Sequence, residues 1–318
     1  MNKLQFKLKG LIFFIFLLIN GTVLAQKDTL SFLHITDLHT IFSLNVYLPD
    51  MMENRKQKQY DQGVNRLRLF LETVPGKTRS DMVIATGDLV DFFDAKTSDS
   101  CILAIQTKQF SKLIGDYYIP VLFTLGNHDV FSFEWKNGKL YHTQNYTGQA
   151  RAEWIRELPC FKNGTYYSKS FRVGSTNYRL IFLDNSFYQF LPEDKGEIPC
   201  IDKSQLYWLN AQLHESDDDI EIILMHIPFE KAVNHKIPTN ELYSVLSKNP
   251  STKLILAGHQ HKNDISDFPS IEGKKIVQVQ TGALVQSTEN WRLINLTENN
   301  ILVSVPGKTE NELVIPIK

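Results

Sequence analysis

The sequence predicts an α/β fold in which two β-sheets pack as a double-sheet β-sandwich flanked by helices. Two observations lead to this prediction. Short apolar runs alternate with helix-like segments through most of the chain, and closely spaced strand-like runs follow near its end. With 42% hydrophobic and 22% charged residues among 318, the composition suits a folded chain with one substantial core.

Runs rich in Val, Ile, Leu and Phe are predicted as buried strands at residues 30–36, 81–86, 119–125, 178–183, 221–225 and 253–257. Apolar residues recur at helical spacing between them, which predicts sheet-covering helices at residues 64–74, 102–113 and 206–213. The final runs are separated by short polar connections, and we expect them to form antiparallel strands that close a second sheet, at residues 275–280, 291–296 and 301–305.

Residues 1–25 have the features of a signal peptide, because three lysines precede an apolar stretch at 11–19 and small residues end at Ala25. The stretch is shorter than the roughly 20 residues of a membrane-spanning helix. We therefore expect an exported protein, periplasmic or extracellular, with no stable membrane insertion after cleavage; a retained anchor is the alternative. Residues 26–318 are predicted as a single domain.

The net charge of -1 comes from 34 basic and 35 acidic residues, so no global field would attract a nucleic-acid polymer. Three cysteines, Cys101, Cys160 and Cys200, follow the signal, and an odd number leaves at least one without an intramolecular partner. Cys160 and Cys200 are the one pair that merits a test for a disulfide. Three free thiols are the alternative, and the oligomeric state is left open.

Residue types that bind metals occur in five blocks, each directly after an apolar run: Asp37-Leu38-His39, Gly87-Asp88, Gly126-Asn127-His128-Asp129, His226 and Gly258-His259-Gln260-His261. Because each block ends a predicted strand, the side chains are expected to gather at one edge of a sheet. Imidazole, carboxylate and amide groups suit Mn, Fe or Zn, and the absence of cysteine argues against a closed structural zinc site. The blocks therefore predict an open catalytic site for two metal ions.

The blocks differ in how specific they are. An Asp-x-His triplet arises by chance in roughly every second chain of this composition, whereas Gly-His-x-His arises in roughly one per hundred. His226 alone is more typical of a buried core histidine than of a ligand. Gly87, Gly126 and Gly258 follow strands, where a residue without Cβ allows the backbone to turn sharply and approach an ion.

In this order the blocks resemble those of the calcineurin-like metallophosphoesterase superfamily, from about residue 30 to residue 305. The resemblance implies the double-sheet α/β sandwich of that family and a dinuclear centre. One metal would be held by Asp37, His39 and His261, and the other by Asn127, His226 and His259. Asp88 would bridge the two ions.

The resemblance also assigns His128 as the histidine beside the scissile phosphate and Asp91 as the carboxylate that orients it. Asp129 is expected to support the ligands rather than to bind metal. Purple acid phosphatases carry a tyrosine at the position of Asp91, and protein serine/threonine phosphatases have Arg-Gly where this chain has Phe92-Phe93. With those two branches not supported, the sequence is similar to the bacterial phosphohydrolase and phosphodiesterase branches of the superfamily.

The resemblance implies a metal-dependent phosphoric ester hydrolase for a small-molecule phosphodiester or phosphomonoester. A metal-bound hydroxide would attack phosphorus while His128 protonates the leaving group. A pyrophosphate-bond hydrolase, such as one for a nucleotide sugar, is an alternative, as is a non-catalytic binding or scaffold protein. An aromatic-rich excursion at residues 130–165 is expected either to cover the metals as a lid or to pack onto the sandwich.

Overall fold

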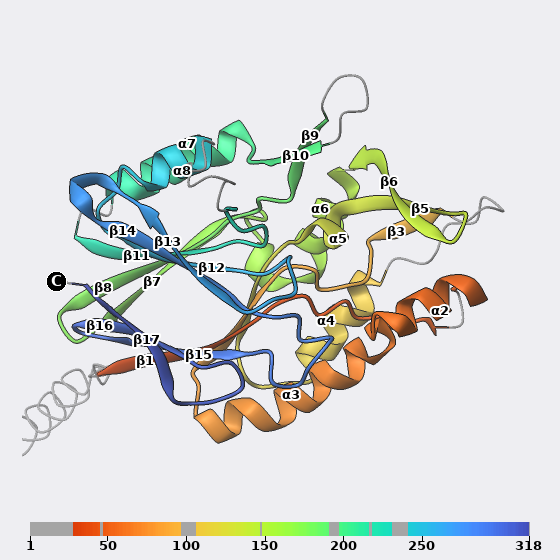
Figure 1. Cartoon of the computed structure of the whole chain (residues 1–318), viewed down its shortest axis with the longest axis horizontal. Coiled ribbons are helices and arrows are strands. Elements are labelled where there is room, and N and C mark those ends of the chain that lie inside the picture. The colour runs from red at the N-terminus through yellow and green to blue at the C-terminus, as the bar shows by residue number, and fades with distance from the viewer. Residues whose placement is uncertain are drawn as a thin grey trace, which may run out of the picture.

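The computed structural model describes residues 28–44, 47–96, 106–146, 148–190, 197–215, 218–230 and 241–317. Two six-stranded sheets pack face to face, and helices cover their outer faces (Figure 1). The predicted fold class, a helix-flanked β-sandwich of the α/β type, is confirmed.

The first sheet has the strand order β17-β16-β15-β1-β2-β4. Its β1, β2 and β4 run parallel, and β15 to β17 extend it from β1 as antiparallel neighbours. The strands are β1 (Thr29–Ile35), β2 (Met82–Thr86), β4 (Val121–Thr124), β15 (Arg292–Thr297), β16 (Asn300–Ser304) and β17 (Asn311–Pro316).

The second sheet has the order β13-β14-β12-β11-β8-β7. Its four central strands run parallel and its two edge strands are antiparallel to their neighbours. The strands are β7 (Tyr167–Val173), β8 (Thr176–Phe182), β11 (Asp219–Leu224), β12 (Thr252–Ala257), β13 (Asp264–Pro269) and β14 (Lys275–Gln280).

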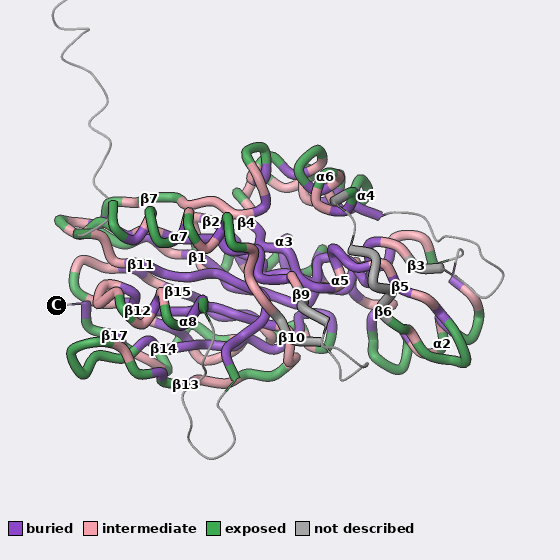
Figure 2. The backbone as a smooth tube through the Cα atoms, turned by 90° about the horizontal axis from the view of Figure 1, so that it is seen from above, coloured by how far each residue is buried: buried purple, intermediate pink, exposed green. Residues whose placement is uncertain are grey.

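Three layers of apolar side chains hold the sheets and helices together, and Figure 2 shows the central strands of both sheets as mostly buried. Strand β1 explains how: Phe32 faces the other sheet, whereas Leu33 and Ile35 pack in the layer toward the helices. The first sheet is covered by α3 (Gly63–Thr78), α4 (Thr107–Gly115) and α6 (Gly148–Glu157), and the second by α7 (Lys203–Glu215) and α8 (Glu241–Leu246).

The remaining elements lie at the end of the sandwich where the parallel strands terminate (Figure 1). A small sheet has the order β3-β5-β6, and β9 pairs with β10. These elements are α2 (Pro49–Gln57), η2 (Tyr60–Gln62), β3 (Asp94–Lys96), α5 (Asn127–Val130), β5 (Phe131–Lys136), β6 (Lys139–Tyr146), η3 (Pro159–Phe161), β9 (Phe187–Phe190) and β10 (Glu197–Cys200); a further turn, η5 (Ile271–Gly273), precedes β14.

One topological expectation is wrong. The run at 275–280 is not part of an antiparallel series with 291–296 and 301–305, because β14 pairs in parallel with β12 in the second sheet. The chain then crosses to the first sheet, where β15 pairs with β1. A buried strand can face parallel or antiparallel neighbours with the same apolar composition, so composition alone does not assign its sheet.

The aromatic excursion packs onto the sandwich through its described side chains. Phe131, Phe133, Trp135 and Trp154 are all at most 2% exposed and belong to the layer under the first sheet. Tyr141 is exposed, and the side chains of residues 142–148 lie outside the described part. For the four buried rings, packing onto the sandwich rather than a lid is the outcome.

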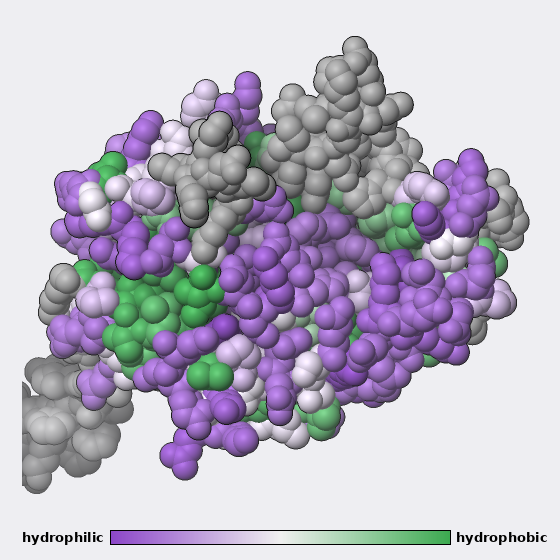
Figure 3. All heavy atoms as spheres, in the orientation of Figure 1, coloured by the Kyte–Doolittle hydropathy of each residue, from purple (hydrophilic) through white to green (hydrophobic). Residues whose placement is uncertain are grey.

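Cys160 and Cys200 are both free thiols, so the structure contains no disulfide between them. Cys101 and the predicted signal peptide lie outside the described residues. Within the described ranges, no helix is both long and apolar enough to cross a membrane. Among the coloured residues on the face seen in Figure 3, most are hydrophilic, apart from one compact hydrophobic patch on the left.

Candidate metal centre

The predicted ligands lie at the carboxyl ends of parallel strands from both sheets. Asp37 follows β1, Asp88 follows β2 and Asn127 follows β4 in the first sheet. His226 follows β11 and His259 follows β12 in the second. Because the two sheets face each other, their strand ends converge on one site, as open α/β sheets commonly arrange their ligands.

The first group of ligand atoms comes from Asp37, His39, Asp88 and His261. The Nε2 atom of His261 lies 3.1 Å from Asp37 Oδ1 and 3.1 Å from His39 Nε2. His39 Nε2 is 3.6 Å from Asp88 Oδ2. Four donor atoms therefore converge within the distance that one ion would span.

The second group comes from Asp88, His226 and His259. His226 Nε2 lies 3.3 Å from Asp88 Oδ2, and His259 Nδ1 lies 3.0 Å from the Asn127 Oδ1 oxygen. Asp88 Oδ2 is thus close to both groups. The structure brings together all seven predicted metal ligands, with Asp88 shared between the two groups.

The donor set fits two metal ions. Asp37 Oδ1 and His226 Nε2 are buried and make no hydrogen bond among the described residues, although each lies within 3.3 Å of a neighbouring ligand atom. Burying such atoms without a partner costs free energy, which a cation would offset. Oxygen and imidazole donors suit Mn, Fe or Zn equally.

The ligand charges support the same conclusion. Burial opposes the charged form of Asp88, yet His226 and His128 hold the pKa of Asp88 well below its usual range. Burial likewise opposes the charged form of Asp37, but the adjacent His261 imidazole, 3.1 Å from Asp37 Oδ1, keeps the pKa of Asp37 low. Both carboxylates are therefore anionic at neutral pH, as metal binding requires.

Two glycines allow the ligands to approach so closely. A Cβ atom on Gly126 would lie 2.2 Å from Asp88 Oδ1, and one on Gly258 would lie 2.5 Å from Asp37 Oδ2. Any larger residue would displace the carboxylate of a predicted metal ligand. The predicted role of these glycines, close approach after a strand, thus has a specific atomic basis.

The backbone of the site is strained. Left-handed φ angles, from 39° to 70°, occur at five ligand residues: Asp37, His39, Asp88, His259 and His261. Non-glycine residues rarely adopt this conformation, and each instance costs of order 1–3 kcal/mol. The surrounding hydrogen bonds must therefore hold these turns in place.

Asp129 supplies several of those bonds. Its carboxylate accepts hydrogen bonds from the backbone N–H groups of Leu89, Val90 and Gly126, at 2.8, 3.1 and 2.8 Å. It therefore ties the Asp88 turn to the Asn127 turn. This is the supporting position that was predicted for Asp129.

Asn185 supports the His226 turn in a similar way. Its Oδ1 atom accepts from the N–H groups of His226 and Ile227, and its amide donates to the Ile227 carbonyl at 2.7 Å. The sequence reasoning missed Asn185. The signal was present, because this residue follows β8 just as the ligands follow their own parallel strands.

His128 and Asp91 are adjacent, but the predicted atoms need correction. His128 Nδ1 contacts the backbone carbonyl of Asp91, not its carboxylate. The Asp91 carboxylate instead accepts hydrogen bonds from Arg55 Nε at 2.8 Å and from the Tyr47 hydroxyl at 3.1 Å. Arg55 therefore holds the carboxylate, and no local pattern in the sequence indicates that partner.

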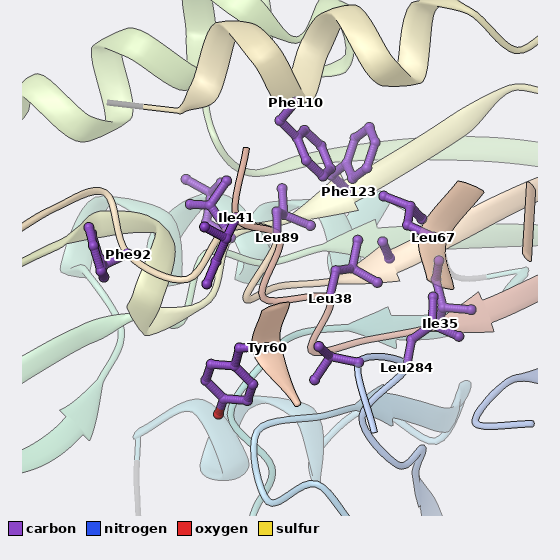
Figure 4. Packing of buried hydrophobic residues seen from close by; sticks show 14 of the residues in the cluster. Ile35, Leu38, Ile41, Tyr60, Leu67, Leu89, Phe92, Phe110, Phe123 and Leu284 are labelled. Atoms are coloured by element: carbon purple, nitrogen blue, oxygen red, sulfur yellow. The ribbon is translucent and has the colours of Figure 1, made fainter. Parts of the chain in front are cut away.

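Tyr60 lies flat against His39, with 4.0 Å between ring centroids and 6° between ring planes. His39 Nδ1 has no hydrogen-bond partner among the described residues, so the stacking contact is an important restraint on the ring beside the Nε2 contact with His261. Figure 4 shows Tyr60 at the border of the apolar cluster, with its hydroxyl directed away from the other labelled residues. Tyr60 was also missed by the sequence reasoning.

A model of the calcineurin-like phosphoesterase family matches residues 30–263. This chain belongs to the calcineurin-like phosphoesterase family. The resemblance that the five blocks indicated is thereby confirmed, and membership supports a phosphoester hydrolase in general terms.

Solved structures agree with this calcineurin-like phosphoesterase at the level of the fold. A dimetal phosphatase from Danio rerio is 15% identical, with 91% of this chain and 99% of that chain covered at a TM-score of 0.59. GAP50 of Plasmodium, described as the anchor in the inner membrane complex, is 17% identical, with 92% and 90% covered at a TM-score of 0.50. No curated protein sequence matches this chain.

Proposed function

We propose that this calcineurin-like phosphoesterase is an exported enzyme that hydrolyses a phosphodiester or phosphomonoester of a small organic phosphate at a dinuclear metal centre. The observation that carries the proposal is the convergence of two ligand groups on the shared Asp88 carboxylate. Within those groups, Asp37 Oδ1 and His226 Nε2 are buried without hydrogen-bond partners among the described residues, as expected for atoms that bind cations.

Two divalent ions bound there would supply Lewis acidity and an activated water to the phosphoryl group. The protein's own contribution would come from His128. Its Nδ1–H would donate to the Asp91 carbonyl, so Nε2 would be the atom left to face substrate. When the ring is protonated, Nε2 would pass its proton to the leaving oxygen as the phosphorus–oxygen bond breaks.

The test is hydrolysis of bis-p-nitrophenyl phosphate and p-nitrophenyl phosphate by metal-stripped protein reconstituted separately with Mn, Fe, Zn and Mg. We expect metal-dependent turnover that Asp88→Asn abolishes, because this change removes the carboxylate shared by both ligand groups. The ratio of the two rates decides between diester and monoester chemistry. Two bound metals without turnover of either compound would contradict the proposal.

Such a negative result would favour one of the two alternatives. Turnover of a nucleotide sugar would then indicate a pyrophosphate-bond hydrolase. Failure on that compound as well would favour a scaffold protein; the fold-level likeness to GAP50, described as an anchor, is the observation that keeps this candidate in view.

Export rests on the lysines, apolar stretch and small residues of positions 1–25. The test is amino-terminal sequencing of the protein recovered from the extracytoplasmic fraction, where we expect Gln26 to be the first residue. Recovery of the uncleaved chain from membranes would instead support a retained anchor.

A further inference from the structure

A buried ion pair stands next to His128, and neither of its members is among the seven predicted metal ligands. Arg55, on α2, donates from Nε to Asp91 Oδ2 at 2.8 Å, and both side chains are at most 2% exposed. The Tyr47 hydroxyl donates to the same oxygen. The residue that receives these two bonds is the one whose carbonyl contacts His128 Nδ1.

Stability does not account for this pair. Arg55 Nη2 and Asp91 Oδ1 are buried without hydrogen-bond partners among the described residues, so the pair is desolvated but incompletely satisfied. Buried ion pairs of this kind contribute little net stability, because desolvation offsets most of the attraction. Its position beside His128 points to another role.

The backbone around Asp91 is fixed on two other sides. The Asp91 N–H donates to the Thr40 carbonyl at 3.2 Å, and the Phe93 N–H donates to the His128 carbonyl at 2.8 Å. The side chain of Asp91 is the third attachment, and Arg55 holds it through a charged hydrogen bond. Together these contacts set the direction of the Asp91 carbonyl.

We propose that Arg55 is a positioning residue for the reaction proposed above: by holding the Asp91 side chain, it keeps the Asp91 carbonyl aimed at His128 Nδ1 and so directs Nε2 toward the leaving oxygen. This inference rests on the proposed function. During the step the Nε2–H bond breaks and a bond from hydrogen to the leaving oxygen forms, while the Nδ1–H remains on the carbonyl. Arg55 itself touches neither substrate nor proton.

The experiment compares two substrates that differ in their need for a proton donor, a p-nitrophenyl ester and the corresponding alkyl ester. p-Nitrophenolate departs without protonation, whereas an alkoxide does not. In Arg55→Met we expect kcat for the alkyl ester to fall about 100-fold, the lower end of general acid catalysis, with less than about a 3-fold loss for the p-nitrophenyl ester. KM should change little for either.

A combined variant provides the decisive measurement. If Arg55 acts through His128, adding Arg55→Met to His128→Ala should cause no further loss on the alkyl ester, because the function it supports is already gone. A further loss of the full size would overturn the proposal. So would an equal loss on both esters in the single variant.

Arg66 offers a matched control. It is another arginine near the site, but it donates to the Val285 carbonyl and to Gln59 instead of Asp91. Arg66→Met should therefore alter the two ester rates by the same factor. Metal content and melting temperature are measured for every variant, so that loss of metal or of folding is recognised separately.

Two milder variants keep the test open if Arg55→Met does not fold. Arg55→Lys retains the charge but not the fork of donors, and Tyr47→Phe removes one hydrogen bond to the same carboxylate oxygen. Each should show the same leaving-group selectivity at reduced size, and its absence in both would refute the role. If the wild-type protein hydrolyses neither ester, the proposed function fails; if the wild type is active and only the selectivity is missing, the function stands and this inference fails.

Discussion

Gly126→Ala tests whether the close approach of the Asn127 turn to Asp88 is necessary for the metal centre. The added Cβ would lie 2.2 Å from Asp88 Oδ1 and 2.3 Å from the Asp88 backbone nitrogen. Ordinary contacts begin near 3.5 Å, so one turn must move by about 1 Å. Metal–ligand distances tolerate only about 0.2 Å, and the bridging carboxylate would therefore leave its position.

We expect Gly126→Ala to lose metal and at least about 100-fold in turnover, with about 1–3 kcal/mol of overpacking strain in the free energy of unfolding. Metal content by mass spectrometry, hydrolysis of bis-p-nitrophenyl phosphate and urea unfolding measure the three effects. Gly76→Ala is the control, because nothing lies within 4 Å of its Cβ on α3, and it should stabilise the protein by roughly 0.5–1 kcal/mol. A Gly126→Ala protein with two metals and wild-type turnover would refute the reasoning.

Three further predictions concern residues around the site. Burial lowers the pKa of His34 from 6.5 to about 3, so the contribution of the neutral ring to the free energy of unfolding is present above pH 6.5 and falls as the pH drops toward 3. The free energy of unfolding, measured with urea, should therefore fall between pH 7.5 and pH 5 by about 2 kcal/mol less in His34→Gln than in the wild type. Asp129→Ala leaves three backbone N–H groups without their acceptor and should weaken metal binding about 10–100-fold, measured by competition with a chelator, and unchanged affinity would count against its tying role. Burial raises the pKa of Cys160 to about 11, so this thiol should react with a disulfide reagent at pH 8 far more slowly than in the unfolded chain. Rapid labelling of Cys160 in the folded protein, located by mass mapping, would contradict this prediction.

The sequence was sufficient for the parts of the molecule whose chemistry is local. The central strands are buried on both faces, so they appear as continuous apolar runs, and β1, β2, β11 and β12 lie within about two residues of their predicted limits. The metal ligands were recognisable because each combines a ligating side chain with the end of such a run. Neither signal depends on distant residues.

The missed features depend on residues far apart in the chain. On α2 only Met51 and Arg55 are buried, so the helix carries no apolar stripe that would reveal its contact with the site. The partner of the Asp91 carboxylate lies 36 residues upstream, and no pattern around either residue indicates the pair. The wrong sheet assignment of β14 has the same cause, because tertiary contacts decide which strands pair.

The strained turns and the helices of the fold are connected by free energy. Five ligand residues with left-handed backbone would together cost several kcal/mol, a large fraction of the stability of an ordinary domain. The fold offsets that cost because the turns follow strands that are buried between the two sheets and their helices. Asp129 and Asn185 also accept backbone hydrogen bonds at the turns. The sandwich therefore acts as the rigid support that lets the seven predicted ligand side chains approach one another closely. His128 and the Asp91 carbonyl, on which the proposed mechanism depends, are positioned by the same turns.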